Sequence, residues 1–379
     1  MKHFKSGHYV TQSGYRAFVP HEINRFWTID DMEVLSLLSQ ADRELGRLDM
    51  FSEYVDIDRY IRMHITKEAN QSSKIEGTQT KIEDAILPEQ EVSSEIRDDW
   101  QEVQNYISAM NNAMDALHRL PFSSRLIKQT HKILLQNVRG KHKMPGEYRR
   151  SQNWIGGATL KDAMFIPPPH HEVPRLMSDL EKFAHNTDNP LPDLLKIALI
   201  HYQFETIHPF LDGNGRVGRL IITLYLVDKK ILRRPILYLS DFFEQHRQLY
   251  YDKLMRVRTH NDLGQWFKFF LTGVIETAKQ GVQTFNKTLQ LQKELDEKLI
   301  TLQARQQGNA RKLLEYIYQH PIFNAAMIAG ALELSMATAY KLINTFEKLQ
   351  IIKEFTGGKR RRLYVFEEYM KLFSPPDFD

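Results

Sequence analysis

Residues 208–219, which read HPFLDGNGRVGR, place an irregular loop of restricted shape between two helices. Pro209 disfavours helical geometry at the residue before it, so the helix through HYQFETI is predicted to end at His208. Gly213 and Gly215 can adopt positive φ without a steric penalty, which lets consecutive backbone N–H groups point inward. A second helix, RVGRLIITLYLV, is predicted to begin directly afterwards. The stretch therefore predicts a helix-loop-helix unit.

The loop has the chemistry of an anion site. The start of the second helix supplies N–H groups and the positive end of a dipole, and Arg216 and Arg219 add two cations. Asp212 suits such a site if Mg²⁺ bridges its carboxylate and phosphate oxygens. His208, which titrates near neutral pH, is placed to accept a proton from an attacking hydroxyl. Together these residues indicate transfer of a phosphorus-containing group onto an alcohol.

Other known sites fit these residues less well. No Gly-Lys-Ser/Thr follows the glycines, as a Walker A loop requires, and the HRD and DFG elements of a protein kinase are absent. His201, Glu205 and His208 have the spacing of zinc ligands on one helix face, but the proline takes His208 off that helix. A glycine-rich helix start alone is ordinary turn chemistry. The combination with a histidine, an acid and two arginines indicates a site.

Most of the chain has helical periodicity. Helices are predicted over residues 31–47, 57–71, 95–118, 123–137, 171–185, 191–206, 216–229, 242–258, 262–279 and 280–306. The last of these is polar with a narrow apolar stripe, which favours a connecting helix between domains. The main strand signal lies at 151–169, where Trp154-Ile155 and Met164-Phe165-Ile166 flank a Gly-Gly loop and predict a hairpin.

Residues 309–367 are predicted to form a unit of their own. The helices ARKLLEYIYQ and AAMIAGAL precede a third helix that opens at Ser335, and the strands IIKEF and RLYVF follow. This order predicts a helix-turn-helix with a β-wing. DNA would suit the third helix and the basic wing, through Met336, Thr338, Lys341, Asn344, Lys359, Arg360, Arg361 and Arg362. The alternative is a protein-docking or dimerisation unit whose basic run is a solvated hairpin tip.

Length and composition set outer limits. A chain of 379 residues predicts roughly two or three domains, and its net charge of +4 is too small to indicate nucleic-acid binding by itself. No cysteine is present, which excludes disulfides, thiolate metal sites and cysteine nucleophiles. No apolar run of signal-peptide or membrane-span type occurs, so a cytoplasmic protein without a membrane partner is expected.

The stretch at 208–219 resembles the signature of the Fic (filamentation induced by cAMP) family, HPFxxGNGRxxR, at every specified position. The resemblance extends over roughly residues 10–300 and includes PGEYRRSQNWIGG at 145–157. It implies a mainly α fold, with a Fic-type helical core and a β-hairpin flap, followed here by the winged helix-turn-helix. The expected division is an N-terminal helical region at 1–120, a catalytic core at 121–278, a connecting helix at 279–308 and a winged-helix domain at 309–379.

The resemblance implies a protein adenylyltransferase that moves AMP from Mg-ATP to a Ser, Thr or Tyr hydroxyl. By position, His208 would be the general base and Asp212 the Mg²⁺ ligand. The nucleotide would contact Gly213, Asn214, Gly215, Arg216, Val217, Gly218 and Arg219. Tyr250 and Tyr251 lie where family members wall the adenine pocket, although two core-facing helix aromatics are an equal alternative. The hairpin at 151–169 would hold the protein substrate by strand addition.

A second stretch, SSKIEGT at 72–78, resembles the family's inhibitory motif (S/T)xxxE(G/N), with Ser72, Glu76 and Gly77 in the required places. A glutamate paired with Arg219 would occupy the region of the γ-phosphate, which predicts an autoinhibited enzyme. By itself such a hexamer is also typical of a helix that ends on a glycine cap. The resemblance to regulated family members makes a homodimer a further expectation.

Two other functions stay open at this point. One is a transcriptional regulator that uses the winged helix on DNA and the Fic-like fold as a nucleotide sensor. The other keeps the enzyme but changes the reaction, either to another phosphate-containing donor or to removal of AMP, with Glu76 positioning water.

Overall fold

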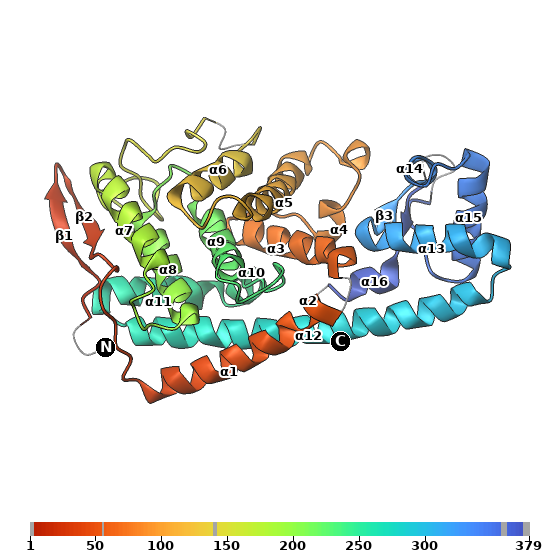
Figure 1. Cartoon of the computed structure of the whole chain (residues 1–379). Coiled ribbons are helices and arrows are strands. Elements are labelled where there is room, and N and C mark those ends of the chain that lie inside the picture. The colour runs from red at the N-terminus through yellow and green to blue at the C-terminus, as the bar shows by residue number, and fades with distance from the viewer. Residues whose placement is uncertain (1–3, 55–56, 139–141, 358–361, 374–379) are drawn as a thin grey trace.

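The computed structural model describes residues 4–54, 57–138, 142–357 and 362–373 (Figure 1). The helices up to residue 300 are α1 (Met32–Asp49), α2 (Phe51–Tyr54), the 3-10 turn η1 (Ile57–Arg59), α3 (Ile61–Ile75), α4 (Ile82–Ala85), η2 (Glu89–Glu91), α5 (Arg97–Leu117), α6 (Ser124–Leu134), η3 (His170–Glu172), α7 (Val173–His185), α8 (Asp193–Ile207), α9 (Asn214–Asp228), α10 (Ser240–Gln245), α11 (Arg247–His260) and α12 (Leu263–Ile300). The remaining elements are β1 (Gly7–Gln12), β2 (Tyr15–Pro20), α13 (Ala304–Gln319), β3 (Ile322–Phe323), α14 (Ala325–Ala331), α15 (Met336–Lys348), β4 (Lys353–Glu354), β5 (Tyr364–Val365) and α16 (Glu367–Lys371). The mainly helical prediction is confirmed.

Helix α8 lies at the centre of the core. Every residue from Leu194 to Ile207 is buried, which is the pattern of a helix covered on all sides. It packs against α7, α9 and α12. The loop at 208–213 therefore starts from a fully buried helix.

Helix α12 is one continuous helix of 38 residues, where the sequence predicted two helices that meet at residue 280. The only breaker near that point is Gly281, and this glycine has a packing role instead. A Cβ built on it would lie 2.8 Å from Leu48 Cδ1, so its absence lets α1 approach closely. Lys268 pairs with Asp31 at 3.1 Å at the start of α1, and the two helices run side by side in the same direction (Figure 1).

The strands differ from the sequence prediction in two places. The antiparallel hairpin β1–β2 near the N-terminus was missed. The predicted hairpin at 151–169 is wrong as a ladder, because only the bridge between Ile155 and Phe165 forms. The N–H groups of Ala158 and Thr159 instead donate to the Asp162 carboxylate, at 2.8 Å each, which closes the tip as a side-chain-capped loop.

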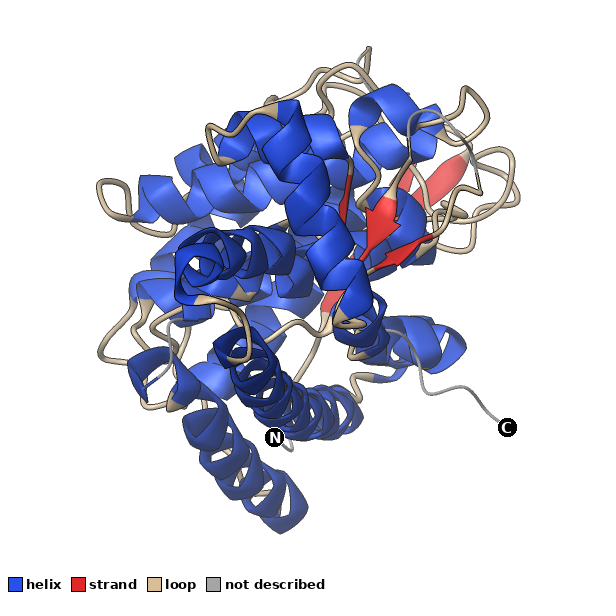
Figure 2. Ribbon diagram, turned by 90° about the vertical axis from the view of Figure 1, so that its right-hand side faces the viewer, coloured by secondary structure: helices blue, strands red, loops and turns tan. Residues whose placement is uncertain are grey.

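The C-terminal elements occur in the predicted order. Helices α14 and α15 are bent by 114° relative to each other, and the strands form an antiparallel sheet in the order β3-β5-β4 (Figure 2). Ser335 caps α15, as expected, by accepting from Thr338 N at 3.2 Å. Met336, Lys341 and Asn344 are exposed, whereas Thr338 is half-buried. The wing residues Lys359, Arg360 and Arg361 lie outside the described residues, and DNA contact stays a prediction.

Across the part of the chain that the structure describes, no single helix is both long and apolar enough to cross a bilayer. Helices α14 and α15 meet that test of length and composition only together, as a sharply bent pair.

The same substitution at two helical glycines tests the close contact of α1 and α12. Gly308→Ala, where nothing lies within 4 Å of the new Cβ, should raise the free energy of unfolding by about 0.5–1 kcal/mol. Gly281→Ala should lose this gain because Leu48 must move. Urea unfolding measures both, and equal stabilisation by the two variants would contradict the packing role of Gly281.

Candidate active site at the start of helix α9

The loop between α8 and α9 is held in one shape by its own side chains. His208 ends α8 with φ of 50°, and Gly213 precedes α9 with φ of 74°. The Asn214 side chain accepts from Phe210 N at 2.8 Å and donates to Phe210 O at 2.9 Å. Asn214, predicted as a nucleotide contact, thus uses its side chain to close the loop.

A buried histidine that sequence reasoning missed supports this loop from α6. His131 stacks on the Phe210 ring at 3.7 Å between centroids. Its Nδ1 accepts from Gly146 N at 2.8 Å, so Nε2 carries the proton and donates to Asp212 O at 3.0 Å. Burial lowers the pKa of His131 to about 4, which keeps this neutral form at pH 7.

Arg149 holds the backbone of His208. Arg149 is 2% exposed, and Nε donates to His208 O at 2.9 Å. The same guanidinium donates to Ser151 O at 3.2 Å and Pro168 O at 2.5 Å, which lie at the two ends of the 151–169 segment. Asn153 Nδ2 adds a bond to His208 O at 3.2 Å. The buried Arg149 therefore links the 151–169 segment to the backbone of His208. The sequence predicted a role for neither Arg149 nor Asn153.

His208 is in the protonation state that a base requires. Burial, together with the charges of Arg258 and Arg149, lowers its pKa to about 3. Its Nδ1 has no hydrogen-bond partner among the described residues. At neutral pH the imidazole is therefore uncharged and able to accept a proton.

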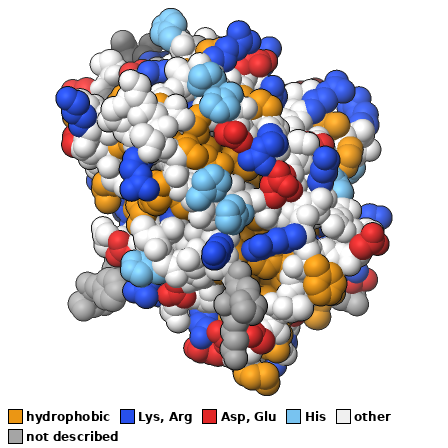
Figure 3. Space-filling model, turned by 90° about the vertical axis from the view of Figure 1, so that its left-hand side faces the viewer, with side chains coloured by type: hydrophobic (Ala, Val, Ile, Leu, Met, Phe, Trp, Pro, Cys, Tyr) orange, Lys and Arg blue, Asp and Glu red, His pale blue; other side chains and the backbone are white. Residues whose placement is uncertain are grey.

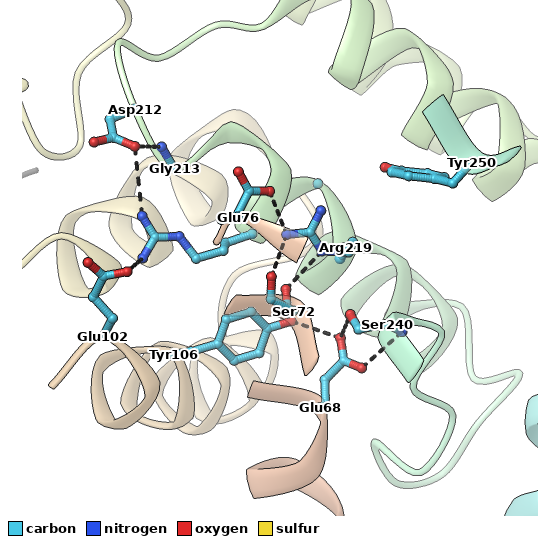
Figure 4. A network of polar contacts seen from close by, with 12 residues as sticks. Glu68, Ser72, Glu76, Glu102, Tyr106, Asp212, Gly213, Arg219, Ser240 and Tyr250 are labelled. Atoms are coloured by element: carbon cyan, nitrogen blue, oxygen red, sulfur yellow. Dashed lines mark hydrogen bonds and ion pairs between the residues drawn. The ribbon is translucent and has the colours of Figure 1, made fainter. Parts of the chain in front are cut away.

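Glu76 and Arg219 form the central contact of the site (Figure 4). Arg219, whose side chain is 1% exposed, donates from Nη2 to Glu76 Oε1 at 2.7 Å. It also donates from Nε to Ser72 Oγ at 2.9 Å and from Nη2 to Ser72 O at 2.8 Å. The predicted pair between the C-terminal end of α3 and the first turns of α9 is present in the structure.

The backbone at the end of α3 places Glu76 beside Arg219. Glu76 caps the helix, and Gly77 follows with φ of +106°. Gly77 N donates to Lys74 O at 3.0 Å, and Thr78 N donates to Ser73 O at 3.3 Å. This is a Schellman motif, so the glycine cap and the inhibitory contact are two properties of the same residues.

The carboxylate lies where an anion would bind. A Cβ built on Gly215 would lie 2.2 Å from Glu76 Oε1, so Glu76 lies directly against the start of α9. Burial would raise the pKa of Glu76, but the charge and hydrogen bond of Arg219, together with the charge of Arg216, hold this pKa below its ordinary value. The ionised glutamate therefore lies against the start of α9, where the backbone N–H groups of a helix favour an anion.

Three other predicted nucleotide contacts lie differently. Arg216 is buried and pairs with Glu102 on α5 at 3.0 Å, and its Nη2 lies 3.7 Å from Asp212 Oδ1. Val217 is fully buried, and its side chain belongs to the core. A Cβ on Gly218 would lie 2.0 Å from Glu205 Oε1, so this glycine lets α8 and α9 approach closely. Val217 and Gly218 thus serve helix packing, and a nucleotide contact at these two positions stays a prediction.

Tyr250 and Tyr251, the two predicted adenine-pocket residues, differ in exposure. Tyr250 is 1% exposed, and its hydroxyl bonds to His201 Nε2 at 2.9 Å, while His201 Nδ1 donates to Gly218 O at 2.7 Å. Tyr250 is therefore a core residue. Tyr251 is 38% exposed, which leaves it as the candidate for a nucleotide wall.

Asp212 suits a metal ion that arrives with phosphates. Its side chain is 41% exposed, and Oδ1 accepts from Gly213 N at 2.6 Å. Within the described ranges nothing bonds to Oδ2, and no group of three or more His, Cys, Asp or Glu could hold a metal ion by itself. A single carboxylate beside an oligophosphate is an arrangement that Mg²⁺ accepts.

The surface at the β1–β2 hairpin end has no large patch of side chains with the same charge. Figure 3, which looks onto the hairpin end of the molecule, shows basic, acidic and histidine side chains mixed with apolar ones. Arg175 on α7 pairs there with Glu172 at 2.7 Å and also contacts Glu22. Charge alone therefore does not select a partner at this end.

Comparison with known proteins places the site in a family context. Residues 35–115 match the family profile "Fic/DOC family N-terminal" and residues 121–226 match "Fic/DOC family". A probable protein adenylyltransferase of Aquifex aeolicus is 38% identical over 89 residues, which cover 24% of this chain and 26% of the relative. A protein adenylyltransferase Fic of Aedes aegypti is 33% identical over 125 residues, which cover 33% and 22%. The matches thus span about a quarter of these curated relatives.

Solved structures share the fold at low sequence identity. A Fic family protein from Desulfovibrio desulfuricans G20 aligns with a TM-score of 0.57 and 20% identity, over 90% of this chain and 97% of that one. Fic-1 from C. elegans aligns with a TM-score of 0.50 and 20% identity, over 68% and 76%.

Replacement of Arg149 tests its hold on His208. Arg149→Met removes a positive charge, so the pKa of His208 should rise, as followed by its imidazole NMR signals during a pH titration. The free energy of unfolding should fall by roughly 2 kcal/mol or more, because buried carbonyl groups lose their donor. The exposed neighbour Arg150→Met is the matched control. A His208 pKa that is equal in both variants would contradict the electrostatic contact.

The pH dependence of stability tests the Glu76–Arg219 pair. Because the folded pKa of Glu76 is lowered, its contribution is complete above the unfolded value of about 4.3 and is lost as the pH falls through the folded pKa. Glu76→Gln should lower stability at pH 7 and flatten its decline in acid, whereas Glu95→Gln in an exposed turn should not. Thermal unfolding at several pH values measures both. A slope unchanged by Glu76→Gln would count against the pair.

Proposed function

Because the chain belongs to the Fic/DOC family, we propose that it transfers AMP from Mg-ATP to a hydroxyl group of a protein and that Glu76 restrains this activity. The observation that carries the proposal is the internal carboxylate of Glu76, bound 2.7 Å from the buried Arg219 at the start of α9 and beside a neutral His208. The printed names of the relatives, which are protein adenylyltransferases, support the reaction.

In the proposed reaction His208 acts as general base. The target hydroxyl gives its proton to the imidazole, and its oxygen forms a bond to the α-phosphorus of ATP. The bond from that phosphorus to the bridging oxygen breaks, and pyrophosphate leaves with the electron pair. The clamp from Arg149 and Asn153 keeps the backbone of His208 in place, so the base is positioned before the target arrives.

The oligophosphate is proposed to lie on the N–H groups at the start of α9, with its charge balanced by Arg216 and Arg219. Glu102 orients Arg216 at 3.0 Å. Mg²⁺, when bound, would offset further negative charge, and Asp212 is the residue that would hold it.

Restraint follows from competition for one cation. Arg219 is almost completely buried, and Glu76 takes one of its donors. A γ-phosphate that approached this guanidinium would meet the carboxylate, and two anions cannot share the position without a large cost. ATP is then proposed to bind weakly or with its α-phosphorus out of line.

The protein substrate is proposed to pair with the Trp154 side of the 151–169 segment. The other side is already covered, because Phe18 N of β2 donates to Ile166 O at 2.9 Å and the Phe18 and Phe165 rings lie 5.9 Å apart. The N–H of Ile155 points toward Phe165 O, at 2.9 Å. The backbone N–H and C=O of the neighbouring Trp154 therefore point to the opposite edge of this strand. Trp154 is 38% exposed there.

Two variants test the proposed function in opposite directions. Glu76→Gly should raise incorporation of labelled AMP into proteins of a lysate by roughly tenfold or more, the effect of one removed charged hydrogen bond. His208→Ala in the Glu76→Gly background should abolish incorporation. Mass spectrometry of the labelled proteins identifies the modified hydroxyl.

Glu95→Gly is the control, since it makes the same substitution in an exposed turn away from Arg219. Thermal unfolding of each variant separates loss of chemistry from loss of fold. Equal incorporation by the wild type and Glu76→Gly would refute the restraint, and incorporation that survives His208→Ala in a folded protein would refute the role of the base.

A further inference from the structure

The C-terminal end of α8 needs hydrogen-bond donors from outside the helix. A helix leaves its last four carbonyl groups without partners of its own, and Pro209 has no N–H to offer to Glu205 O. Phe210 N, the next donor along the chain, is bound to the Asn214 side chain at 2.8 Å. Residues 205–207 are buried, so their carbonyl groups require donors from other parts of the fold.

Two buried arginines supply such donors. Arg258 of α11 donates from Nη2 to Glu205 O and from Nε to Thr206 Oγ1, both at 3.1 Å. Arg149 donates from Nη2 to Ile207 O at 3.3 Å, in addition to its bond with the next carbonyl along the chain. Two cations therefore cap the end of α8, where the helix dipole also favours positive charge.

The guanidinium of Arg258 has a second contact, with the 151–169 segment. Its Cζ lies 3.9 Å from the centroid of the Phe165 ring, and this ring is 3% exposed. Phe165 is also the residue whose N–H and C=O form the bridge with Ile155. The planar group thus uses its N–H edge on the last turn of α8 and its face on the segment proposed to receive the substrate.

The N-terminal hairpin fixes the backbone of Arg258. Ser6, directly before β1, donates from Oγ to Arg258 O at 3.2 Å and from its N–H to Asn261 Oδ1 at 2.7 Å. At the other end of the hairpin, Phe18 N donates to Ile166 O at 2.9 Å. The hairpin therefore contacts α11 beside Arg258 and the strand that carries Phe165, so both sides of the cation–ring contact are held in place.

Arg258 also acts on the imidazole through its charge. It is 7% exposed, and although burial lowers its pKa, a guanidinium stays charged at neutral pH. After burial, the charge of Arg258 is the next cause that lowers the pKa of His208; Arg149 acts in the same direction and Glu76 in the opposite one. His208 itself has φ of 50°, a conformation that a residue other than glycine keeps only where its surroundings hold it.

We propose that Arg258 is a positioning residue that holds the His208 base and the 151–169 segment in one fixed relation, so that a substrate strand paired with that segment presents its hydroxyl to the imidazole. The catalytic half of this inference rests on the proposed function. The link between α8, Arg258 and the segment does not.

The link is tested on the full chain without any substrate. Arg258→Met should raise the pKa of His208, followed through its imidazole NMR signals, because a positive charge is removed. It should also speed hydrogen exchange of the Ile155 and Phe165 amides by about tenfold, as loss of a desolvated cation–ring contact implies. Arg256→Met, which removes an exposed cation of the same helix, should match the wild type in both measurements. Unchanged exchange in Arg258→Met would refute the link to the segment, and an unchanged pKa would refute the link to the base.

Arg258→Lys separates charge from geometry and serves as well if the methionine variant does not fold. Lysine keeps the charge but cannot reproduce the planar fork that reaches Glu205 O and Thr206 Oγ1 together. The pKa of His208 should therefore stay close to the wild-type value, while exchange of the Ile155 and Phe165 amides should still be faster. Wild-type exchange in Arg258→Lys would show that charge alone suffices and would overturn the positioning role.

The catalytic half is tested in the Glu76→Gly background with labelled ATP and lysate proteins. Arg258→Met and Arg258→Lys should each lower AMP incorporation by about tenfold or more, because the base and the target are no longer aligned. Calorimetry should find the affinity for Mg-ATP unchanged, and Arg256→Met should alter neither quantity. Full incorporation by a folded Arg258→Lys variant would refute the role in catalysis. If Glu76→Gly itself transfers no AMP, the proposed function fails, while the exchange and titration measurements still decide the link.

Discussion

The site is organised around one buried guanidinium. Arg219 is almost fully enclosed, and a charge so placed requires an anionic partner because water cannot reach it. In this structure the partner is Glu76, supplied by the chain itself. In the proposed function, a substrate phosphate and this carboxylate are alternatives for the same position, and activity is proposed to depend on which of them Arg219 holds.

Helix α3 carries that carboxylate and is fixed along its length. Glu68 accepts from Tyr106 Oη of α5 at 3.0 Å and from Ser240 Oγ of α10 at 2.6 Å (Figure 4). Lys67 pairs with Asp241 at 2.8 Å, and Gln71 donates to the same carboxylate at 2.7 Å. Such a helix is costly to move as a whole.

Local motifs allowed part of this to be predicted. The loop residues His208 and Asp212 follow from a short stretch whose chemistry depends on neighbours in sequence, whereas the pair of Glu76 with Arg219 was expected from the resemblance to the family's inhibitory motif. Arg149, Glu102 and His131 could not be found in this way, because each acts on a backbone or side chain far away in the chain. Periodicity predicted most of the helices. It did not predict that α12 continues through residue 280, because Gly281 allows close contact with α1 and does not break the helix. The 151–169 hairpin failed for a similar reason, as the Asp162 side chain takes the N–H groups that a ladder would use.

The unbroken course of α12 also bears on how the molecule can be divided. At 1.5 Å per residue its 38 residues extend about 57 Å. Phe51 stacks on Phe285 at 5.3 Å, and Gln292 bonds to Tyr60, so the N-terminal segment at 51–60 packs against the C-terminal half of α12. A fragment cut after residue 278 would lose that support. The helices before α12 and the C-terminal elements after it are therefore joined by one continuous helix, not by a flexible linker.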